Sequence, residues 1–590
     1  MSPNSGDVQR GNWKNWWEFL FSSVGCLVGL GNIWRFPYIC FRNGGGAFLL
    51  PYFIFMFLCA MPMMFLEMTV SQYSNLGPGR VWVCCPLFKG IGYGMIVLTG
   101  IVSIYYNVIL AWTLYYFGMS FSSDLPWTRC DKEWNTDTCI IRGMNYTPAL
   151  FRNNFTEKKN VSFEAVTFHQ HTSAEEFWER NVLDMSEGID SPGHIRWQLL
   201  LCLLAAWFAV FLCLFKGIKT SGKVVYVAAT VPYLFLLVLL IRGLVFNIDG
   251  AIKGLKVFLI PRMEDLLKFD VWCDAAVQMF YSAGLGWGGI PTLASYNSFN
   301  NNVFRDAMIL PIVDVITSIF AGCVVFVTLG FMAEEAGVPI ENVVDSGPGI
   351  AFVVYPEAVS KLPLPQLWAV LFFLMLFTVG LDSQMVHVQT LTGALLDNFP
   401  KALHKWKTAL TGILCLLGFL LGIPCITQGG IYVLTLIDWY CASVSVMLLT
   451  FLEVVALAWF YGVRRIYEDL EIMIGHRPSG LWHVMWRFVT PIVILIIWLV
   501  SLSRYSEVEY GTYRYPSHAV GIGWMIAILS LILIPAGMIS SISKTADAST
   551  PLIERLRVSV QPTDEWKPAI RPPPGDVEMS KTLIFNGMTL

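Results

Sequence analysis

Residues 28–37 read VGLGNIWRFP, and they lie inside an otherwise apolar segment that runs from about residue 16 to residue 40. A plain membrane-spanning helix avoids close glycines, an asparagine and an arginine near its middle, because intramembrane polar groups are costly and usually mark a pathway or a binding site. Gly25, Gly29 and Gly31 weaken the helix and allow its backbone to open. Open backbone at membrane depth is tolerated only where it faces protein or a cavity. The stretch therefore predicts a broken helix built around a ligand.

The composition of the chain indicates an integral membrane protein. Of its 590 residues, 55% are hydrophobic and 14% are charged, which is less charge than a soluble protein carries. A net charge of -3 argues against a nucleic-acid partner. About 20 apolar residues span a bilayer core. Twelve segments meet this length, near residues 16–40, 47–72, 90–118, 197–215, 224–245, 275–299, 307–332, 366–396, 408–426, 432–460, 484–502 and 519–541.

The long hydrophilic loop over residues 119–196 predicts the orientation of the chain. It holds three glycosylation sequons, which favour an extracellular face, at Asn145, Asn154 and Asn160. Cys130 and Cys139 lie in the same loop, close enough to form a disulfide in an oxidising compartment, with two free thiols as the alternative.

This orientation divides the chain into three parts. With the loop outside after three spans, both termini are cytoplasmic, and the lysines and arginines of the short inner connections agree with that assignment. We expect a cytoplasmic N-terminus over residues 1–14, a membrane domain over residues 15–541 and a cytoplasmic tail over residues 542–590. The tail is Pro-rich and polar, which predicts that it is mobile.

A second interrupted segment strengthens the prediction of a ligand site. Residues 278–289 read QMFYSAGLGWGG, with four glycines inside the sixth apolar segment. Breaks in the first and sixth segments match two five-helix halves, each beginning with a broken helix. Matched breaks of this kind point to a transporter site at the bilayer midplane. Glycine-mediated close packing of helices is the alternative, and the corresponding positions of the two breaks disfavour it.

At this point the chain resembles the neurotransmitter:sodium symporter family, over roughly residues 10–540. The resemblance rests on six ordered motifs: GLGNIWRFPY at 29–38, NGGGAFLLPY at 43–52, SIYYNVILAW at 103–112, EEFWER at 175–180, ASYNSFNNN at 294–302 and FFLMLFTVGLDS at 372–383. It implies an all-α membrane protein with the leucine-transporter fold, in which twelve helices contain a 5+5 inverted repeat and helices 1 and 6 are broken. It also implies sodium-driven uptake of a small solute and, in animal members, chloride dependence.

The resemblance implies two sodium sites. Sodium is a hard cation that needs oxygen ligands, and unwound backbone carbonyls supply them. The first site would use Leu27, Asn32, Ser282 and the position held by Asp314. The second would use the carbonyls of Gly25, Val28 and Val379 with the side chains of Asp382 and Ser383. Asp382 lies in an apolar helix, where a bound cation resolves the cost of an unpaired carboxylate; a hydrogen-bonded structural carboxylate is the alternative.

Chloride would be held by hydroxyl and amide donors, and here the chain departs from the family. The matching positions are Tyr52, Gln278, Ser282 and Ser318, together with Asp314 where the family has asparagine. Asparagine offers an N–H to chloride, whereas an ionised aspartate offers only acceptors. Asp314 either supplies the negative charge itself and relaxes the chloride requirement, or it is protonated and donates as asparagine would. We hypothesise a weakened requirement for chloride.

Substrate recognition would begin at Gly29, where family members that carry monoamines have an aspartate. With no fixed carboxylate there, the substrate can bring its own. That carboxylate would meet the backbone amides of Leu30 and Gly31, where the partial positive charge of the second half-helix gathers. The first sodium ion and the Tyr106 hydroxyl would complete its shell. The remaining implied substrate positions are Val102, Tyr281, Gly284, Trp287, Ser383 and His387.

Two bulky residues suggest a small substrate. Trp287 resembles the glycine-transporting branch, and Leu27 is larger than the alanine usual at its position. The alternative is that Trp287 rotates away and packs elsewhere. His387 lies one helical turn beyond Ser383; it touches substrate, senses pH or packs, and we favour packing.

The resemblance also implies two gates. Arg35 and Asp438 would form the outer ion pair, with Tyr106 and Tyr281 as an aromatic lid beneath it. The inner network would contain Arg10, Trp13, Tyr296 and Asp397. Glu67 would cap backbone groups that are freed by the break in the sixth helix.

The sequence as a whole predicts a sodium-coupled, chloride-assisted symporter in the plasma membrane that imports a small zwitterionic amino acid, with glycine as the best candidate. Proline, GABA and betaine are alternatives, as is a transport-inactive receptor or partner subunit. We expect no enzyme, because no nucleophile–base pair or metal-spaced cluster appears. The expected ions are two sodium ions and chloride. The expected partners are the amino acid and the bilayer, with a homo-oligomer left open.

Overall fold

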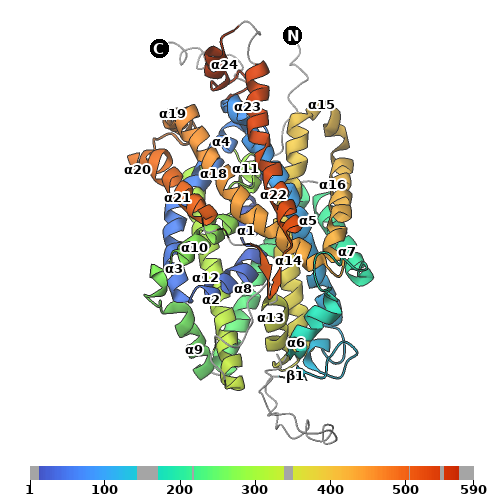
Figure 1. Ribbon diagram of the computed structural model, residues 1–590. Helices are drawn as coiled ribbons and strands as arrows, with labels where there is room; N and C mark the ends of the chain where they lie inside the picture. Colours follow the sequence, from blue (N-terminus) through green and yellow to red (C-terminus); the bar gives the residue numbers. More distant parts are fainter. Residues whose placement is uncertain are drawn as a thin grey trace, which may run out of the picture.

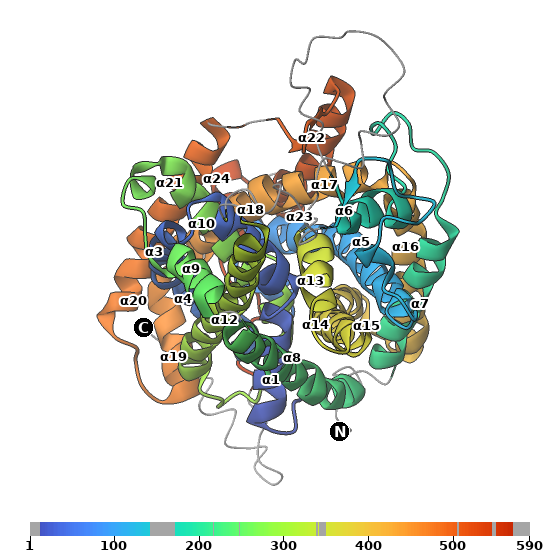
Figure 2. The same ribbon diagram turned by 90° about the horizontal axis from the view of Figure 1, so that it is seen from below.

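The computed structural model describes residues 12–141, 171–215, 218–246, 248–337, 340, 350–503, 505, 507–544 and 550–569, and these are overwhelmingly α-helical. The helices form an elongated bundle, in which α24 and α15 mark one end and α6 and α9 the other (Figure 1). We call these the α24 end and the α6 end. Seen along the bundle, α3 and α19 lie on one side and α5, α7 and α16 on the other (Figure 2).

The helices of the first half agree with the predicted segments. Their bounds are α1 Trp16–Leu27, α2 Phe36–Arg42, α3 Gly46–Phe55, α4 Met61–Ser74, α5 Lys89–Met119, α6 Ser173–Glu176, α7 Trp197–Leu214, α8 Ile218–Phe246, α9 Ile248–Leu259, α10 Phe269–Ser282 and α11 Gly289–Ala294. A π-helical turn over Gly31–Arg35 precedes α2, and another over Met56–Ala60 joins α3 to α4.

The second half continues the same pattern. Its helices are α12 Val303–Ala336, α13 Ile350–Ser360, α14 Pro365–Asn398, α15 Pro400–Leu403, α16 Lys407–Gly422, α17 Gly430–Tyr440, α18 Val446–Val455, α19 Val463–Ile474, α20 Gly480–Val484, α21 Thr490–Ser503, α22 Ser517–Leu531, α23 Leu533–Lys544 and α24 Leu552–Ser559. The strands form two short pairs, β1 Cys139–Ile140 with β2 His171–Thr172 and β3 Glu509–Tyr510 with β4 Tyr513–Arg514.

The apolar segments are long enough to cross a membrane. Within the described ranges, nine helices meet the length and composition of a span, and eleven do if each of two bent helix pairs counts as one span. The sixth predicted segment is absent from that count because its helix is divided into the short α10 and α11. The fold prediction of a twelve-helix bundle with broken first and sixth helices is confirmed.

Both predicted breaks are present, and glycine explains the geometry of the second. The first helix stops at Leu27 and resumes at Gly31 with a bend of 53°. The sixth stops at Ser282 and resumes at Gly289, and inside this break Gly284, Gly286 and Gly288 all have positive φ angles. L-residues with side chains rarely adopt such angles, so the glycines allow the chain to turn sharply at membrane depth.

The freed backbone of the second break is partly satisfied by a buried acid, as predicted. Glu67 is fully buried on α4, and its Oε1 accepts a hydrogen bond of 2.9 Å from the Gly286 N–H. A buried N–H without a partner would cost about 1–3 kcal/mol. Glu67 thus holds the unwound segment of the sixth helix in place.

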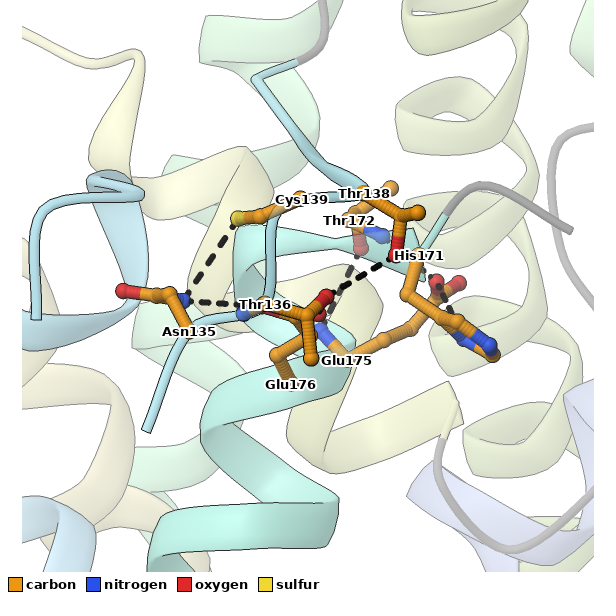
Figure 3. A network of polar contacts seen from close by, with 8 residues as sticks. All are labelled: Asn135, Thr136, Thr138, Cys139, His171, Thr172, Glu175 and Glu176. Carbon is orange, nitrogen blue, oxygen red and sulfur yellow. Dashed lines mark hydrogen bonds and ion pairs between the residues drawn. The ribbon is translucent and has the colours of Figure 1, made fainter. Parts of the chain in front are cut away.

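The outer loop is tied together beside α6 (Figure 3). The predicted disulfide between Cys130 and Cys139 is present, and β1 pairs with β2 in parallel register. Glu176 is buried and accepts hydrogen bonds from the Thr136 N–H at 3.0 Å and the Asn135 amide at 3.1 Å. The three sequons, at Asn145, Asn154 and Asn160, lie outside the described residues.

The C-terminal segment, which contains α24, packs against α4 and the helices near it, so the prediction of a mobile tail is wrong for residues 551–569. The Trp566 ring lies 5.2 Å from Tyr73 and 5.7 Å from Tyr461, and its Nε1 donates to the Tyr461 hydroxyl. Glu565 forms a 2.9 Å ion pair with Arg80. One tryptophan in a polar, Pro-rich stretch supplies the apolar anchor that overall composition conceals.

Candidate functional site

The two breaks meet at a cluster of buried polar side chains. The Asn32 amide nitrogen donates to Asp314 Oδ1 at 2.7 Å, Ser318 Oγ at 2.9 Å and Ser282 Oγ at 3.1 Å. The Ser282 hydroxyl donates to the same Asp314 oxygen at 2.8 Å. The side-chain oxygen of Asn32, Oδ1, accepts a hydrogen bond from the Gly29 N–H at 3.0 Å, which connects the cluster to the first break.

Most of the side chains predicted for the first sodium ion and for chloride converge here. The Tyr52 hydroxyl lies 3.4 Å from Ser318 Oγ, and the Gln278 amide donates to the Gly31 carbonyl at 3.4 Å. Asp314 is fully buried, and among the described residues its Oδ2 has no hydrogen-bond partner. A buried carboxylate oxygen without a partner fits a site for a cation.

The second predicted sodium site surrounds Asp382. This residue is 2% exposed on α14, and neither carboxylate oxygen has a hydrogen-bond partner in the described part of the chain. Its carboxylate lies directly against Gly25, where even one added methyl group would overlap it. The neighbouring Ser383 hydroxyl donates to the Gly25 carbonyl at 3.1 Å. Val28 and Val379 are buried alongside. The buried Asp382 carboxylate, the Ser383 hydroxyl and the Gly25 carbonyl place several oxygen atoms together, and such a group of ligands suits a hard cation.

A cavity of about 40 Å³ lies beside both predicted sodium sites, because Asn32 and Ser282 of the first and Ser383 of the second line it. A buried water needs roughly 10–15 Å³ on this scale, so the cavity holds about three waters or one small solute. It is lined by Cys26, Leu27, Gly29, Gly31, Asn32, Tyr106, Tyr281, Ser282, Gly284, Trp287, Gly289, Ser383 and His387.

The cavity has a polar end and an aromatic end. At the polar end, the Leu30 N–H donates to the Tyr106 hydroxyl at 3.1 Å. At the aromatic end, the Trp287 ring lies 5.3 Å from Tyr281 and 5.9 Å from His387. Trp287 therefore faces the cavity rather than rotating away, and it limits the length of any solute.

Two implied substrate positions do not line this cavity. Val102 is fully buried and is not among the lining residues, and Leu30 takes part through its backbone N–H rather than its side chain. In the other direction, Cys26 and Gly289 line the cavity although they were not predicted. Gly289 begins the second half of the broken sixth helix, so the position of the break could have indicated it.

The predicted outer ion pair is not formed among the described residues. The Arg35 guanidinium lies instead over the Tyr281 ring, 4.1 Å from its centroid. Asp438 accepts a hydrogen bond of 2.8 Å from the Tyr105 hydroxyl. The reason is steric: the ring of Tyr281 occupies the position next to the guanidinium, and a cation over an aromatic face is itself stabilising.

The pathway toward the α24 end is closed. Trp13 is 7% exposed, its ring lies 6.2 Å from that of Tyr296, and its Nε1 donates to the Leu293 carbonyl at 3.1 Å. Asp397 lies nearby and accepts from the Gly77 N–H at 3.3 Å. Arg10, the fourth predicted member of the inner network, lies outside the described residues.

A helical membrane bundle with two interrupted helices, and with buried carboxylates beside a small cavity that both breaks line, is the architecture of an ion-coupled solute transporter. The chain belongs to the sodium:neurotransmitter symporter family, whose sequence profile matches residues 10–545. Its relatives are solute transporters and not enzymes. The family is sodium- and chloride-dependent, and its members are multi-pass plasma-membrane proteins.

Three relatives show how far the similarity extends. The chain is 43% identical to the sodium- and chloride-dependent glycine transporter 2 of Xenopus laevis, over 95% of this chain and 72% of the relative. It is 42% identical to glycine transporter 1 of Xenopus laevis, over 96% of this chain and 89% of the relative. It is also 42% identical to the sodium- and chloride-dependent GABA transporter 2 of Mus musculus, over 96% of this chain and 92% of the relative. Identity alone does not separate glycine from GABA.

Proposed function

We propose that this protein is a sodium-coupled symporter that imports a small zwitterionic amino acid, with glycine as the best candidate. The observation that carries the proposal is the cavity of about 40 Å³ with Trp287 at its aromatic end. Gly29 adds no charge to it, so the substrate supplies the carboxylate that meets the Leu30 N–H and the Tyr106 hydroxyl. A larger side chain has no room beside the Trp287 indole.

The ions complete the proposal. One sodium ion would bind beside Asn32 and Asp314 and a second beside Asp382, with both termini in the cytoplasm and the α6 end outside. Two sodium ions, one zwitterion and one chloride ion would move a net charge of about +1, to which a membrane potential of 100 mV contributes roughly 2.3 kcal/mol. Oxygen atoms without partners at Asp314 and Asp382 support this assignment.

Uptake by cells that express the full chain tests the proposed function. We expect sodium-dependent uptake of radiolabelled glycine that unlabelled glycine inhibits best in a panel with proline, GABA and betaine. Stronger inhibition by one of the other three would reassign the substrate. Protein at the cell surface without sodium-dependent uptake or current for any of them would support a transport-inactive receptor or partner subunit instead.

Replacing Trp287 should widen the substrate range. The Trp287→Ala variant removes the indole from the aromatic end of the cavity, so we expect uptake of alanine or proline relative to glycine to rise at least about tenfold, a change of about 1.4 kcal/mol. Competition by these amino acids against labelled glycine measures the ratio. Trp197→Ala is the matched control, because Trp197 is 63% exposed and remote from the cavity. An unchanged ratio in Trp287→Ala would contradict the size argument.

The docked C-terminal segment should favour the state that is closed toward the cytoplasm. Trp566 is half-buried, so Trp566→Ala should weaken its docking by about 1–2 kcal/mol, less than a fully buried tryptophan would cost. We expect the thiol of a Thr392→Cys reporter to react several-fold faster in this background, because Thr392 lines a cavity beside Tyr296 and is 5% exposed. Trp406→Ala, at an exposed site of the same end, should leave the rate unchanged.

A further inference from the structure

His387 has a more specific position than a packing residue needs. It lies on α14, one turn beyond Ser383, lines the cavity and is 8% exposed. The edge of its ring meets Tyr106, with centroids 5.5 Å apart at 88°, and its face stacks on Trp287 at 5.9 Å and 28°. The rings of Tyr106 and Trp287 therefore hold the imidazole in the cavity wall between the polar end and the aromatic end.

Two buried residues, Gln384 and Ser103, determine which nitrogen of the His387 imidazole carries the hydrogen. The Gln384 amide nitrogen donates to both the carbonyl oxygen and the hydroxyl of Ser103, each at 2.9 Å. A carbonyl oxygen can only accept, so the amide group of Gln384 cannot be reversed without placing two acceptors together. Ser103 is 1% exposed and Gln384 is fully buried, so water does not relieve such a clash.

The orientation of Gln384 then sets the tautomer of His387. Gln384 Oε1, an acceptor, lies 3.4 Å from His387 Nδ1. The neutral imidazole therefore places its hydrogen on Nδ1 and a lone pair on Nε2. Nδ1 contacts Gln384, so Nε2, on the other side of the ring, is the nitrogen left to meet a ligand in the cavity that His387 lines. The wall of the cavity thus offers a hydrogen-bond acceptor.

We propose that His387, held by Gln384 and Ser103, accepts a hydrogen bond from the nitrogen of the bound substrate and thereby selects short zwitterions that keep at least one N–H. This inference rests on the proposed function and deepens it. The carboxylate of the substrate lies at the Leu30 end, and its ammonium group faces Nε2. A quaternary ammonium compound leaves Nε2 buried and unpaired, which lowers its affinity by about tenfold or more. Betaine is therefore disfavoured as substrate.

The series glycine, sarcosine, N,N-dimethylglycine and betaine tests the inference, because each step replaces one N–H with a methyl group. Sodium-dependent currents in cells that express the full chain give KM and maximal current for each compound. In the wild type we expect KM to rise moderately over the first two steps and by at least about tenfold at the last step, where the final donor is lost.

Variants separate the loss of the donor from the growth in size. His387→Leu keeps comparable bulk but removes the acceptor, so the KM of glycine should rise about tenfold while the last step of the series shrinks to a few-fold. His387→Gln restores an acceptor oxygen and should keep the step. Gln384→Met removes the acceptor that fixes the hydrogen on His387 Nδ1, so the tautomer is no longer set and the last step of the series should shrink. His404→Leu, at an exposed turn, is the matched control.

The outcomes distinguish this inference from the proposed function. If His387→Leu reaches the cell surface and keeps both the wild-type KM for glycine and the full last step, size alone explains the series and the inference is overturned. If His387→Leu does not reach the surface, the result with Gln384→Met decides in the same way. A wild-type chain at the surface that responds to no member of the series overturns the proposed function as well.

Discussion

Asp382→Asn should reduce sodium-dependent uptake by at least about a hundredfold, because removing one partner of a buried ion pair costs about 3–5 kcal/mol. The carboxylate is 2% exposed and has no hydrogen-bond partner among the described residues, so its charge is balanced only when a cation binds. Asparagine is nearly the same size but supplies one weaker oxygen ligand. The measurement is uptake of labelled glycine over a range of sodium concentrations, normalised to protein at the cell surface.

Two controls make the result interpretable. Asp270→Asn removes a carboxylate from an exposed position at the start of α10, and it should leave uptake and sodium dependence unchanged. Asp382→Glu keeps the charge but lengthens the side chain against Gly25, where space is lacking. We therefore expect it to bind sodium more weakly than the wild type. Normal uptake by Asp382→Asn would show that this carboxylate is a structural residue and not a sodium ligand.

The sequence predicted best those features that local chemistry determines. Clustered glycines indicated both breaks, which the structure places at residues 28–30 and 283–288. In the second break, Gly284, Gly286 and Gly288 have positive φ angles that other residues rarely adopt. Glu67 was predicted to cap backbone groups that the second break frees, and its Oε1 accepts a hydrogen bond from the Gly286 N–H. The disulfide between Cys130 and Cys139 was predicted from their closeness in one loop.

Features that depend on tertiary packing were harder to predict. The approach of Arg35 to Asp438 depends on the position of the Tyr281 ring, which no local pattern specifies, and the structure places the guanidinium over that ring instead. The tail looked mobile because its composition is polar, yet Trp566 finds a site between Tyr73 and Tyr461 that the rest of the fold creates. For His387 the helical spacing to Gln384 was visible, but the contact of Gln384 with Ser103 on α5 was not.

The hydrogen bonds around Asp314 show why the aspartate, which stands where the family has asparagine, should affect the binding of both sodium and chloride. Asn32 and Ser282 both donate to Asp314 Oδ1, so the carboxylate connects residues that we propose for the first sodium ion with residues that we propose for chloride. An asparagine at this position would direct an N–H toward the anion, whereas the aspartate directs a bare oxygen. The structure leaves that oxygen, Oδ2, fully buried and without a partner in the described part of the chain.

Asp314→Asn should therefore make transport more dependent on chloride. In the wild type, an ionised Asp314 supplies negative charge next to the first sodium ion, so we expect uptake to fall by no more than about threefold when gluconate replaces chloride, a change of less than 1 kcal/mol. In Asp314→Asn that charge must come from chloride, and the same replacement should reduce uptake by at least about tenfold. The measurement is glycine uptake at fixed sodium, with chloride varied.

A second substitution in the same shell separates charge from geometry. Ser318→Ala removes a hydroxyl that accepts from Asn32 and that we assign to the chloride shell, but it leaves the Asp314 carboxylate in place. Because the fixed charge remains, uptake in gluconate should stay within about threefold of uptake in chloride, as in the wild type. Asp314→Asn should lower uptake chiefly in gluconate, because only it exchanges a fixed negative charge for a mobile one. Complete loss of wild-type uptake in gluconate would contradict this expectation, and it would favour a protonated Asp314 that donates to chloride as asparagine does.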